Sequence, residues 1–303
     1  MSTQHWVESG GIRLAARSWG DAGNPTIILV HGYPDCSHVW DAVAQQLSRD
    51  FHVIAYDVRG AGESDVPKAQ RDYALAQLAA DTVAVADALA PDKPFHLVGH
   101  DWGSIQSWET VTTPELQTRI ASYTSMSGPC LDHVGHWSRA QPSSGSRLTR
   151  FFTQLRQSWY IAAFQLPGAP LAWNLGMAKL WPRVLLKTEG IRVEPSPSQL
   201  KDGRNGINLY RANVLPCLLR PRERHTEVPV QLLVALRDPY VQTALFEGLT
   251  RWAPKLWRRV MDKMHWMPLS APVEVAEHIA EFVQFADGGP ESDALRAARV
   301  VEA

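Results

Sequence analysis

Short apolar runs alternate with longer amphipathic stretches along most of this 303-residue chain, and this alternation restricts the fold more than any other feature. Most of the runs are nearly continuous in apolar residues, as is typical of parallel strands covered on both faces. The last run is more polar, so we expect it at an edge of the sheet. The expected strands are residues 26–32, 51–57, 95–101, 120–128, 228–236 and 256–265. Helical periodicity between them predicts a mostly parallel, doubly wound α/β sheet.

The alternation stops between residues 129 and 225, where the signals are mainly helical. Because strands precede and follow this segment, we interpret it as an insertion and not as a separate tandem domain. An insertion after a strand's carboxyl end lies above the edge of the sheet at which open α/β folds bind ligands. We therefore predict a core of residues 1–128 and 226–285, a helical cap of residues 129–225, and a frayed or loosely docked tail of residues 286–303.

Composition favours a small molecule as the partner. The formal net charge is −1, from 30 Lys and Arg against 31 Asp and Glu, so we expect neither nucleic acid nor a membrane as a partner. Three widely spaced cysteines, Cys36, Cys130 and Cys217, fit neither a disulfide framework nor a metal site. No secretory signal and no apolar run of about 20 residues is visible, which predicts a cytoplasmic protein.

Residues 99–103, Gly-His-Asp-Trp-Gly, have the frame of a sharp strand-to-helix turn that usually presents a serine. Asp101 stands in the place of that serine. The N-terminus of a helix favours a carboxylate and keeps it ionised, and such a carboxylate can attack an electrophilic carbon to form an ester. The alternative is that Asp101 only caps the helix. We expect His100 to shape the turn and not to act as a base.

Hydrolysis of such an ester needs a base, a group that orients the base, and donors for an oxyanion. His265 follows the last expected strand and Asp238 follows the strand before it, which is the chain order of α/β-hydrolases. Asp132 is a rival to Asp238. The backbone N–H groups of Tyr33 and Trp102 are the expected oxyanion donors.

Together these residues resemble the epoxide hydrolases of the α/β-hydrolase fold, over about residues 5–285. The motifs that carry the resemblance are His31-Gly32-Tyr33-Pro34, Asp57-x-Arg59-Gly60-x-Gly62-x-Ser64, Gly99-x-Asp101-Trp102-Gly103, Asp238 and His265. The chain resembles most the hydrolase half of actinobacterial proteins that fuse such a domain to a short-chain dehydrogenase. The resemblance implies an α/β-hydrolase fold with an inserted cap, an apolar epoxide and water as substrates, and no cofactor or metal.

The same core motifs occur in haloalkane dehalogenases, so the cap has to separate the two activities. Opening an epoxide leaves an alkoxide, which neutral phenols can protonate. In the epoxide hydrolase pattern one Tyr precedes a Phe-Gln-x-Pro-Gly segment and another lies in an Asn-x-Tyr-Arg segment. Tyr160 and Tyr210 occupy these two places. The residues expected to contact substrate are His31, Pro34, Trp159 and Trp266.

The sequence thus predicts an epoxide hydrolase that makes a vicinal diol. Asp101 attacks the epoxide carbon while Tyr160 and Tyr210 donate to the ring oxygen. His265, oriented by Asp238, then activates water against the ester. The alternatives are a haloalkane dehalogenase and a catalytically silent ligand receptor of the same fold.

Overall fold

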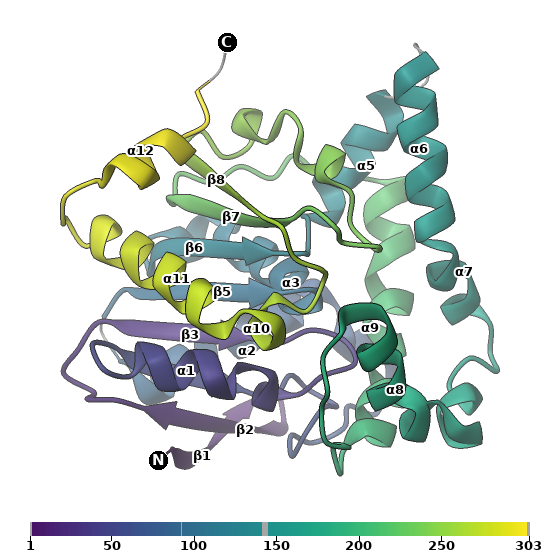
Figure 1. The fold of residues 1–303 in the computed structure, drawn as a ribbon. Helices are drawn as coiled ribbons and strands as arrows, with labels where there is room; N and C mark the ends of the chain where they lie inside the picture. The colour runs from purple at the N-terminus through teal and green to yellow at the C-terminus, as the bar shows by residue number, and fades with distance from the viewer. Residues whose placement is uncertain (1, 92, 141–144, 302–303) are drawn as a thin grey trace.

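The structure, a computed structural model, describes residues 2–91, 93–140 and 145–301. Within them an eight-stranded sheet has the order β1-β2-β4-β3-β5-β6-β7-β8 (Figure 1). The pairs β1–β2 and β2–β4 are antiparallel, and the other pairs are parallel. The strands are β1 (Thr3–Ser9), β2 (Ile12–Trp19), β3 (Thr26–Val30), β4 (His52–Tyr56), β5 (Phe95–His100), β6 (Ile120–Met126), β7 (Val230–Ala235) and β8 (Leu256–Met261). The expected mostly parallel sheet, with β8 at an edge, is confirmed.

Helices cover both faces of the sheet, which explains why the central strands are continuously apolar. On one face α1 (Asp41–Leu47) packs beside α11 (Pro272–Ala286), and on the other α2 (Leu75–Leu89) packs beside α3 (Trp102–Val111). Successive residues of β3 point to opposite faces. Ile27 and Leu29 accordingly pack with α1 and α11, and Ile28 and Val30 pack with α2 and α3.

The segment between β6 and β7 consists mainly of helices, which lie beside the sheet (Figure 1). We call this group, from α5 to α9, the cap. Its helices are α5 (Leu131–Ala140), α6 (Gly145–Gln157), α7 (Trp159–Gln165), α8 (Ala178–Glu189) and α9 (Gln199–Leu219), with a π-helical turn η3 (Trp173–Met177) before α8. The shorter helices α4 (Pro114–Gln117) and α10 (Met267–Ser270) belong to the core. None of the helices in the described ranges combines the length and the apolar character needed to cross a bilayer.

An ion-pair network joins the cap to the core where the chain returns from α9. The guanidinium of Arg222 bonds both Asp132, at 2.8 Å, and Glu109, at 2.7 Å. Arg224 pairs with Glu109 as well, at 2.8 Å. Asp132, the rival to Asp238 as the partner of the histidine, is therefore bound at this junction.

The C-terminal segment differs from the sequence-based expectation. Residues after α11 form α12 (Asp293–Ala298), and Leu295 is fully buried against Trp257 and Phe282. The Val300 N–H donates to the Leu256 carbonyl of β8 at 2.8 Å. The expectation of a frayed or loosely docked tail is therefore wrong as far as residue 300, because a hydrogen bond to the edge strand β8 and an apolar contact hold this segment. Residues 302–303 lie outside the described residues.

Candidate active site

Asp101 sits at a strained turn between β5 and α3, as its glycine-flanked sequence predicts. Its backbone has φ 53° and ψ −123°, a conformation that few residues with a side chain adopt. The glycines allow the close packing that this turn requires: a Cβ on Gly99 would lie 2.6 Å from the Gly103 carbonyl, and one on Gly103 would collide with the Val30 carbonyl. The turn places the Asp101 side chain at the carboxyl end of the sheet.

The loop after β3 brings a backbone donor to Asp101. The Tyr33 N–H donates to Asp101 Oδ1 at 2.6 Å, and the following Tyr33-Pro34 peptide bond is cis. The second expected donor, the Trp102 N–H, belongs to the first residue of α3.

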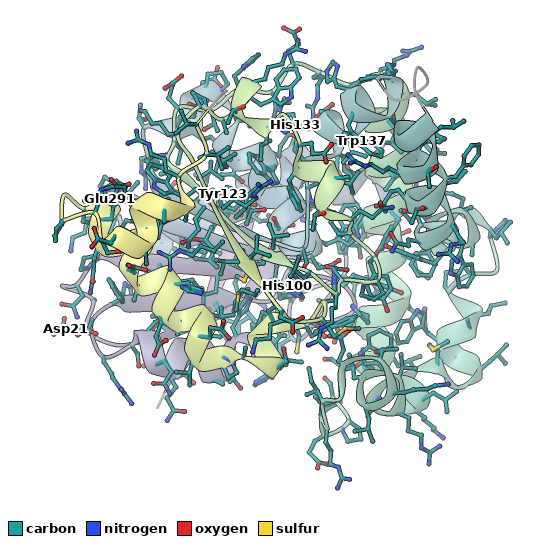
Figure 2. All side chains as sticks on the ribbon, turned by 45° about the horizontal axis from the view of Figure 1, so that its top comes forward. Asp21, His100, Tyr123, His133, Trp137 and Glu291 are labelled. Carbon is teal, nitrogen blue, oxygen red and sulfur yellow. The ribbon has the colours of Figure 1, made fainter. Side chains whose placement is uncertain are left out.

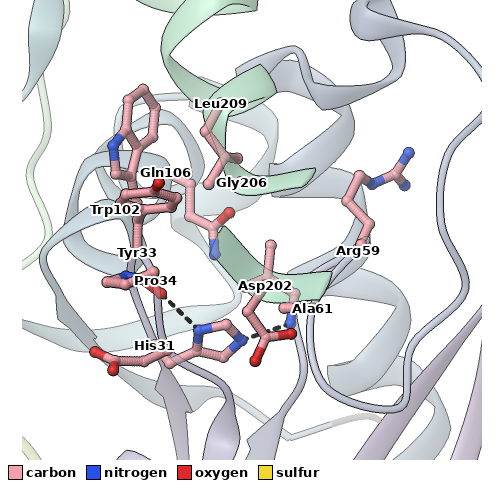
Figure 3. A pocket seen from close by; sticks show the side chains of 14 residues that line it. His31, Tyr33, Pro34, Arg59, Ala61, Trp102, Gln106, Asp202, Gly206 and Leu209 are labelled. Atoms are coloured by element: carbon pink, nitrogen blue, oxygen red, sulfur yellow. Dashed lines mark hydrogen bonds between the residues drawn. The ribbon is translucent and has the colours of Figure 1, made fainter. Parts of the chain in front are cut away.

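His31 supports this loop from inside the core. Its Nδ1–H donates to the Gly32 carbonyl at 2.9 Å, and its Nε2 accepts from the Val58 N–H at 2.8 Å (Figure 3). Burial lowers the pKa of His31, which favours the neutral ring that this pattern requires. Figure 3 shows the small pocket that His31 lines with Trp102 and Asp202, whereas Asp101 is not among its lining residues.

His265 connects Asp101 to Asp238. Its Nδ1–H donates to Asp238 Oδ2 at 2.9 Å, and its Nε2 lies 3.6 Å from Asp101 Oδ2. The other Asp238 oxygen accepts the N–H groups of Tyr240 and Val241, at 2.8 and 3.0 Å, which fixes the carboxylate. His265 comes four residues after the end of β8, so β8 is shorter than the expected strand of residues 256–265.

His100 fixes the backbone of the histidine loop. Its Nε2–H donates to the His265 carbonyl at 2.9 Å, and the ring lies in the interior of the molecule (Figure 2). Burial, with a smaller effect of His265, lowers the pKa of His100 to about 4. His100 therefore stays neutral and shapes the site.

Two carboxylates decide the charge of His265. Burial lowers its pKa, but Asp238 and Asp101 outweigh burial and raise the pKa to about 10. For Asp238, burial raises the pKa and the contact with His265 more than reverses this effect. The two carboxylates therefore favour the imidazolium form of His265.

Two tyrosines reach the site from the cap. Tyr160 on α7 and Tyr210 on α9 have ring centroids 5.9 Å apart, and the Tyr210 ring lies 4.7 Å from that of Trp102. Burial, followed by nearby ionisable groups that include Asp101, raises the pKa of both phenols. Both are neutral at pH 7 and can donate a proton.

The other expected substrate contacts fall into two groups. Trp266 is buried beside His265, and its Nε1–H donates to Asp35 Oδ2 at 2.8 Å. Pro34 is tied to the cap because its carbonyl accepts from Gln199 Nε2 at 2.8 Å. Trp159 is not brought to the site: its side chain is 69% exposed on the outside of α7.

Three residues near the histidine were not singled out from the sequence. The Tyr240 ring lies 4.9 Å from that of His265 and 5.8 Å from that of Tyr160. Glu189, at the end of α8, accepts the Trp266 N–H at 3.0 Å. Burial raises the pKa of Asp35 to about 7. Tyr240 lies two residues after Asp238 and Asp35 directly follows Pro34, so their positions in the sequence could have identified them. Glu189 is far from these motifs in the sequence, and only the fold brings it near His265.

The glycine-rich loop after β4 has a structural role. The Asp57 carboxylate accepts the N–H groups of Ser37 and Glu63, each at 2.8 Å. The Gly62 N–H donates to Asp202 of α9 at 2.8 Å, so the loop also contacts the cap. Within the described ranges, no three or more His, Cys, Asp or Glu side chains are arranged to hold a metal ion.

The chain is similar to known proteins over most of its length. A family model described as alpha/beta hydrolase fold matches residues 25–272. "Probable oxidoreductase EphD" of Mycobacterium tuberculosis is 34% identical over 96% of this chain, which spans 51% of that protein. "Epoxide hydrolase 4" of Mus musculus is 35% identical over 88% of this chain and 75% of its own length.

Solved structures share the same fold. A Bacillus megaterium epoxide hydrolase aligns with a TM-score of 0.79 and 21% identity, over 92% of this chain and 100% of that one. The epoxide hydrolase VrEH1 of Vigna radiata aligns with a TM-score of 0.75 and 22% identity, over 94% and 98% of the two chains.

Proposed function

We propose that this chain, which belongs to the alpha/beta hydrolase fold family, is an epoxide hydrolase that works through an ester of Asp101. One observation carries the proposal: a carboxylate in the place of the usual serine has a backbone donor and an imidazole on the core side and two neutral phenols on the cap side. Relatives named epoxide hydrolases support the same choice.

The first step is attack by Asp101 on an epoxide carbon. A carbon–oxygen bond of the ring breaks, and the oxygen takes a proton from Tyr160 or Tyr210. A strained ether offers no carbonyl for a serine to acylate, so a carboxylate nucleophile suits this substrate. Aromatic rings of Tyr33, Phe164 and Tyr210 pack together here, which favours an apolar substrate.

Formation of the ester also prepares His265 for the second step. Asp101 loses its charge on becoming an ester, so one of the two carboxylates that raise the pKa of His265 is gone. The imidazolium can then give its proton to the tyrosinate left by the first step, which restores a neutral phenol and a neutral base.

Hydrolysis completes the cycle. His265 takes a proton from water, and the hydroxide attacks the ester carbonyl, whose oxyanion is held by the N–H groups of Tyr33 and Trp102. The tetrahedral intermediate expels the alkoxide of the product, which takes the proton of the added hydroxyl and departs as the diol. Asp101 leaves as a carboxylate and His265 as an imidazolium, which is the state in which the cycle began.

A single turnover in heavy-oxygen water tests this mechanism. With enzyme in excess over styrene oxide, the oxygen added to the diol should come from Asp101 and be unlabelled, and the label should enter the Asp101 peptide. Label in the first-turnover diol would mean that water attacks the epoxide directly. Halide release from chloroalkanes or bromoalkanes without diol formation from a panel of epoxides would favour a dehalogenase.

A further inference from the structure

The cap segment from α5 to α8 combines a strongly positive charge with exposed apolar side chains. Seven Lys and Arg residues and no Asp or Glu lie between His133 and Thr188, although the whole chain has a net charge of −1. The acidic residues that balance this charge lie elsewhere in the chain. Charge balance over the full sequence therefore conceals a strongly basic segment.

Five of these cations form no ion pair with any residue in the described part of the chain. Arg156, Lys179, Arg183 and Lys187 are exposed, and Arg139 instead donates to the backbone carbonyls of Gly135 and Leu219. Arg150 differs, because it pairs with Glu247 at 2.7 Å. The positive charge of this segment of the cap is thus largely uncompensated.

Large apolar side chains are exposed on the same segment of the cap. Leu148, Phe152, Leu155 and Trp159 follow helical spacing along α6 and into α7, and are 44%, 57%, 58% and 69% exposed. A second set follows α7, at Leu166, Leu171, Leu175 and Leu180. In Figure 1 α6 and α7 lie on the side of the cap that is away from the sheet. A helix on the surface of a globular protein normally turns its polar side chains to the solvent.

We propose that this face of the cap docks on a lipid surface that carries anionic headgroups. Helices that lie in the plane of a membrane interface combine Leu, Phe and Trp with Lys and Arg in this way. Unpaired cations attract an anionic leaflet, and the apolar side chains enter the boundary between headgroups and acyl chains. The expectation from overall charge that a membrane is not a partner is revised for this face.

Charge complementarity selects a lipid surface over a second copy of the chain. A symmetric contact between two copies would bring this face against itself, and unpaired cations would oppose cations. An anionic bilayer meets both features of the face at once.

The arrangement also relates the membrane to the catalytic site. Tyr160 directly follows Trp159 on α7. The Tyr160 phenol points inward to the site, whereas the Trp159 indole is exposed on the outside of the helix. An apolar substrate dissolved in the lipid would be close to the cap. Docking itself does not depend on hydrolysis, so binding and activity can be measured separately.

Vesicle flotation of the full chain tests the proposal. Vesicles of equal parts phosphatidylglycerol and phosphatidylcholine should carry the protein, and vesicles of phosphatidylcholine alone should not. The double variant Arg156→Glu/Lys179→Glu should lose about thirtyfold in partitioning, since each cation near the surface contributes about 1 kcal/mol. Lys68→Glu/Arg258→Glu, a matched reversal at two exposed positions of the core, should bind like the parent.

A second pair of variants tests the apolar contribution. Phe152→Ser/Leu155→Ser should also release the protein, whereas Val66→Ser/Val260→Ser, which removes exposed apolar residues of the core, should not. Sedimentation velocity of the same variants tests whether a second copy of the chain, and not a lipid surface, covers this face. No flotation with either vesicle, equal flotation with both, or a dimer that the cap variants dissociate would each overturn the proposal.

Discussion

The core and the cap differ in where their charged and apolar side chains lie. The core buries some of its charges in pairs, as in Arg59 with Asp81 and His265 with Asp238. In the cap, Arg156 and Lys179 form no ion pair with any residue that the structure describes, and several leucines are exposed to solvent. The core is built to hold reacting groups at fixed distances, and the cap combines an inner face that completes the site with an outer face that can contact another phase.

The difference is sharpest on α7, where adjacent residues serve the two faces. Tyr160 packs inward beside Tyr210, and Trp159 is exposed. A helix turns by about 100° per residue, so neighbours in sequence need not share an environment. Changes in the core should therefore stop the reaction outright, whereas changes in the cap should reduce a rate or a binding constant.

The largest effect should come from the nucleophile. Asp101→Ala removes the group that forms the ester, and kcat should fall by about 10,000-fold or more in a diol-formation assay. Asp50→Ala, at an exposed position of the core, is the control and should keep full activity. A loss of less than tenfold in Asp101→Ala would show that the reaction does not need an enzyme carboxylate here.

Loss of the base should block the second step and leave the first. In His265→Gln we expect ester hydrolysis to slow by about 1,000-fold, so that the alkylated enzyme accumulates. Intact-mass spectrometry should show the protein heavier by one substrate. The exposed His38→Gln is the control. Turnover near the parent rate, with no adduct, would contradict the role of His265.

The cap tyrosines should have a smaller, graded effect. Tyr160→Phe and Tyr210→Phe should each slow alkylation by about 10-fold, and the double variant by about 1,000-fold, because the remaining phenol can partly replace the lost one as proton donor. Stopped-flow measurement of ester formation separates this step from hydrolysis. Undiminished epoxide opening in the double variant would remove the tyrosines from the mechanism.

The junction between core and cap should affect stability more than chemistry. Arg222→Ala leaves Asp132 and Glu109 without this partner, and the free energy of unfolding should fall by about 2 kcal/mol, less than for a fully buried pair because Arg222 is half exposed. Urea denaturation measures it. Lys255→Ala, which breaks an exposed pair with Glu227, should change stability by less than about 0.5 kcal/mol. Equal losses in the free energy of unfolding would mean that this junction stabilises the fold no more than an exposed ion pair does.

The stability of the core should also depend on pH through His265. Folding raises the pKa of His265 from 6.5 to about 10, so its contribution is full below about pH 6.5 and is lost as the pH rises through about 10. The difference in unfolding free energy between the parent and His265→Gln should therefore narrow with rising pH. A difference that stays constant over this range would show that His265 is not protonated in the folded enzyme.

The sequence alone indicated the parts of this protein that depend on local patterns. Continuous apolar runs identified parallel strands, since both faces of such strands are covered. Glycines around Asp101 identified a tight turn, because only glycine permits that approach of two backbone segments. Asp238 and His265 could be named because the carboxyl ends of neighbouring parallel strands meet at one edge of the sheet.

Only the tertiary structure decided which side chains meet across long distances in the chain. The sequence did not show that Glu189 and Tyr240 reach the histidine, that Asp132 is bound by Arg222, or that Trp159 faces outward. It also gave no sign that residues near Leu295 dock on β8. These contacts depend on how helices of the cap and the C-terminal segment pack, and packing is set by the shape of surfaces that exist only after the chain has folded.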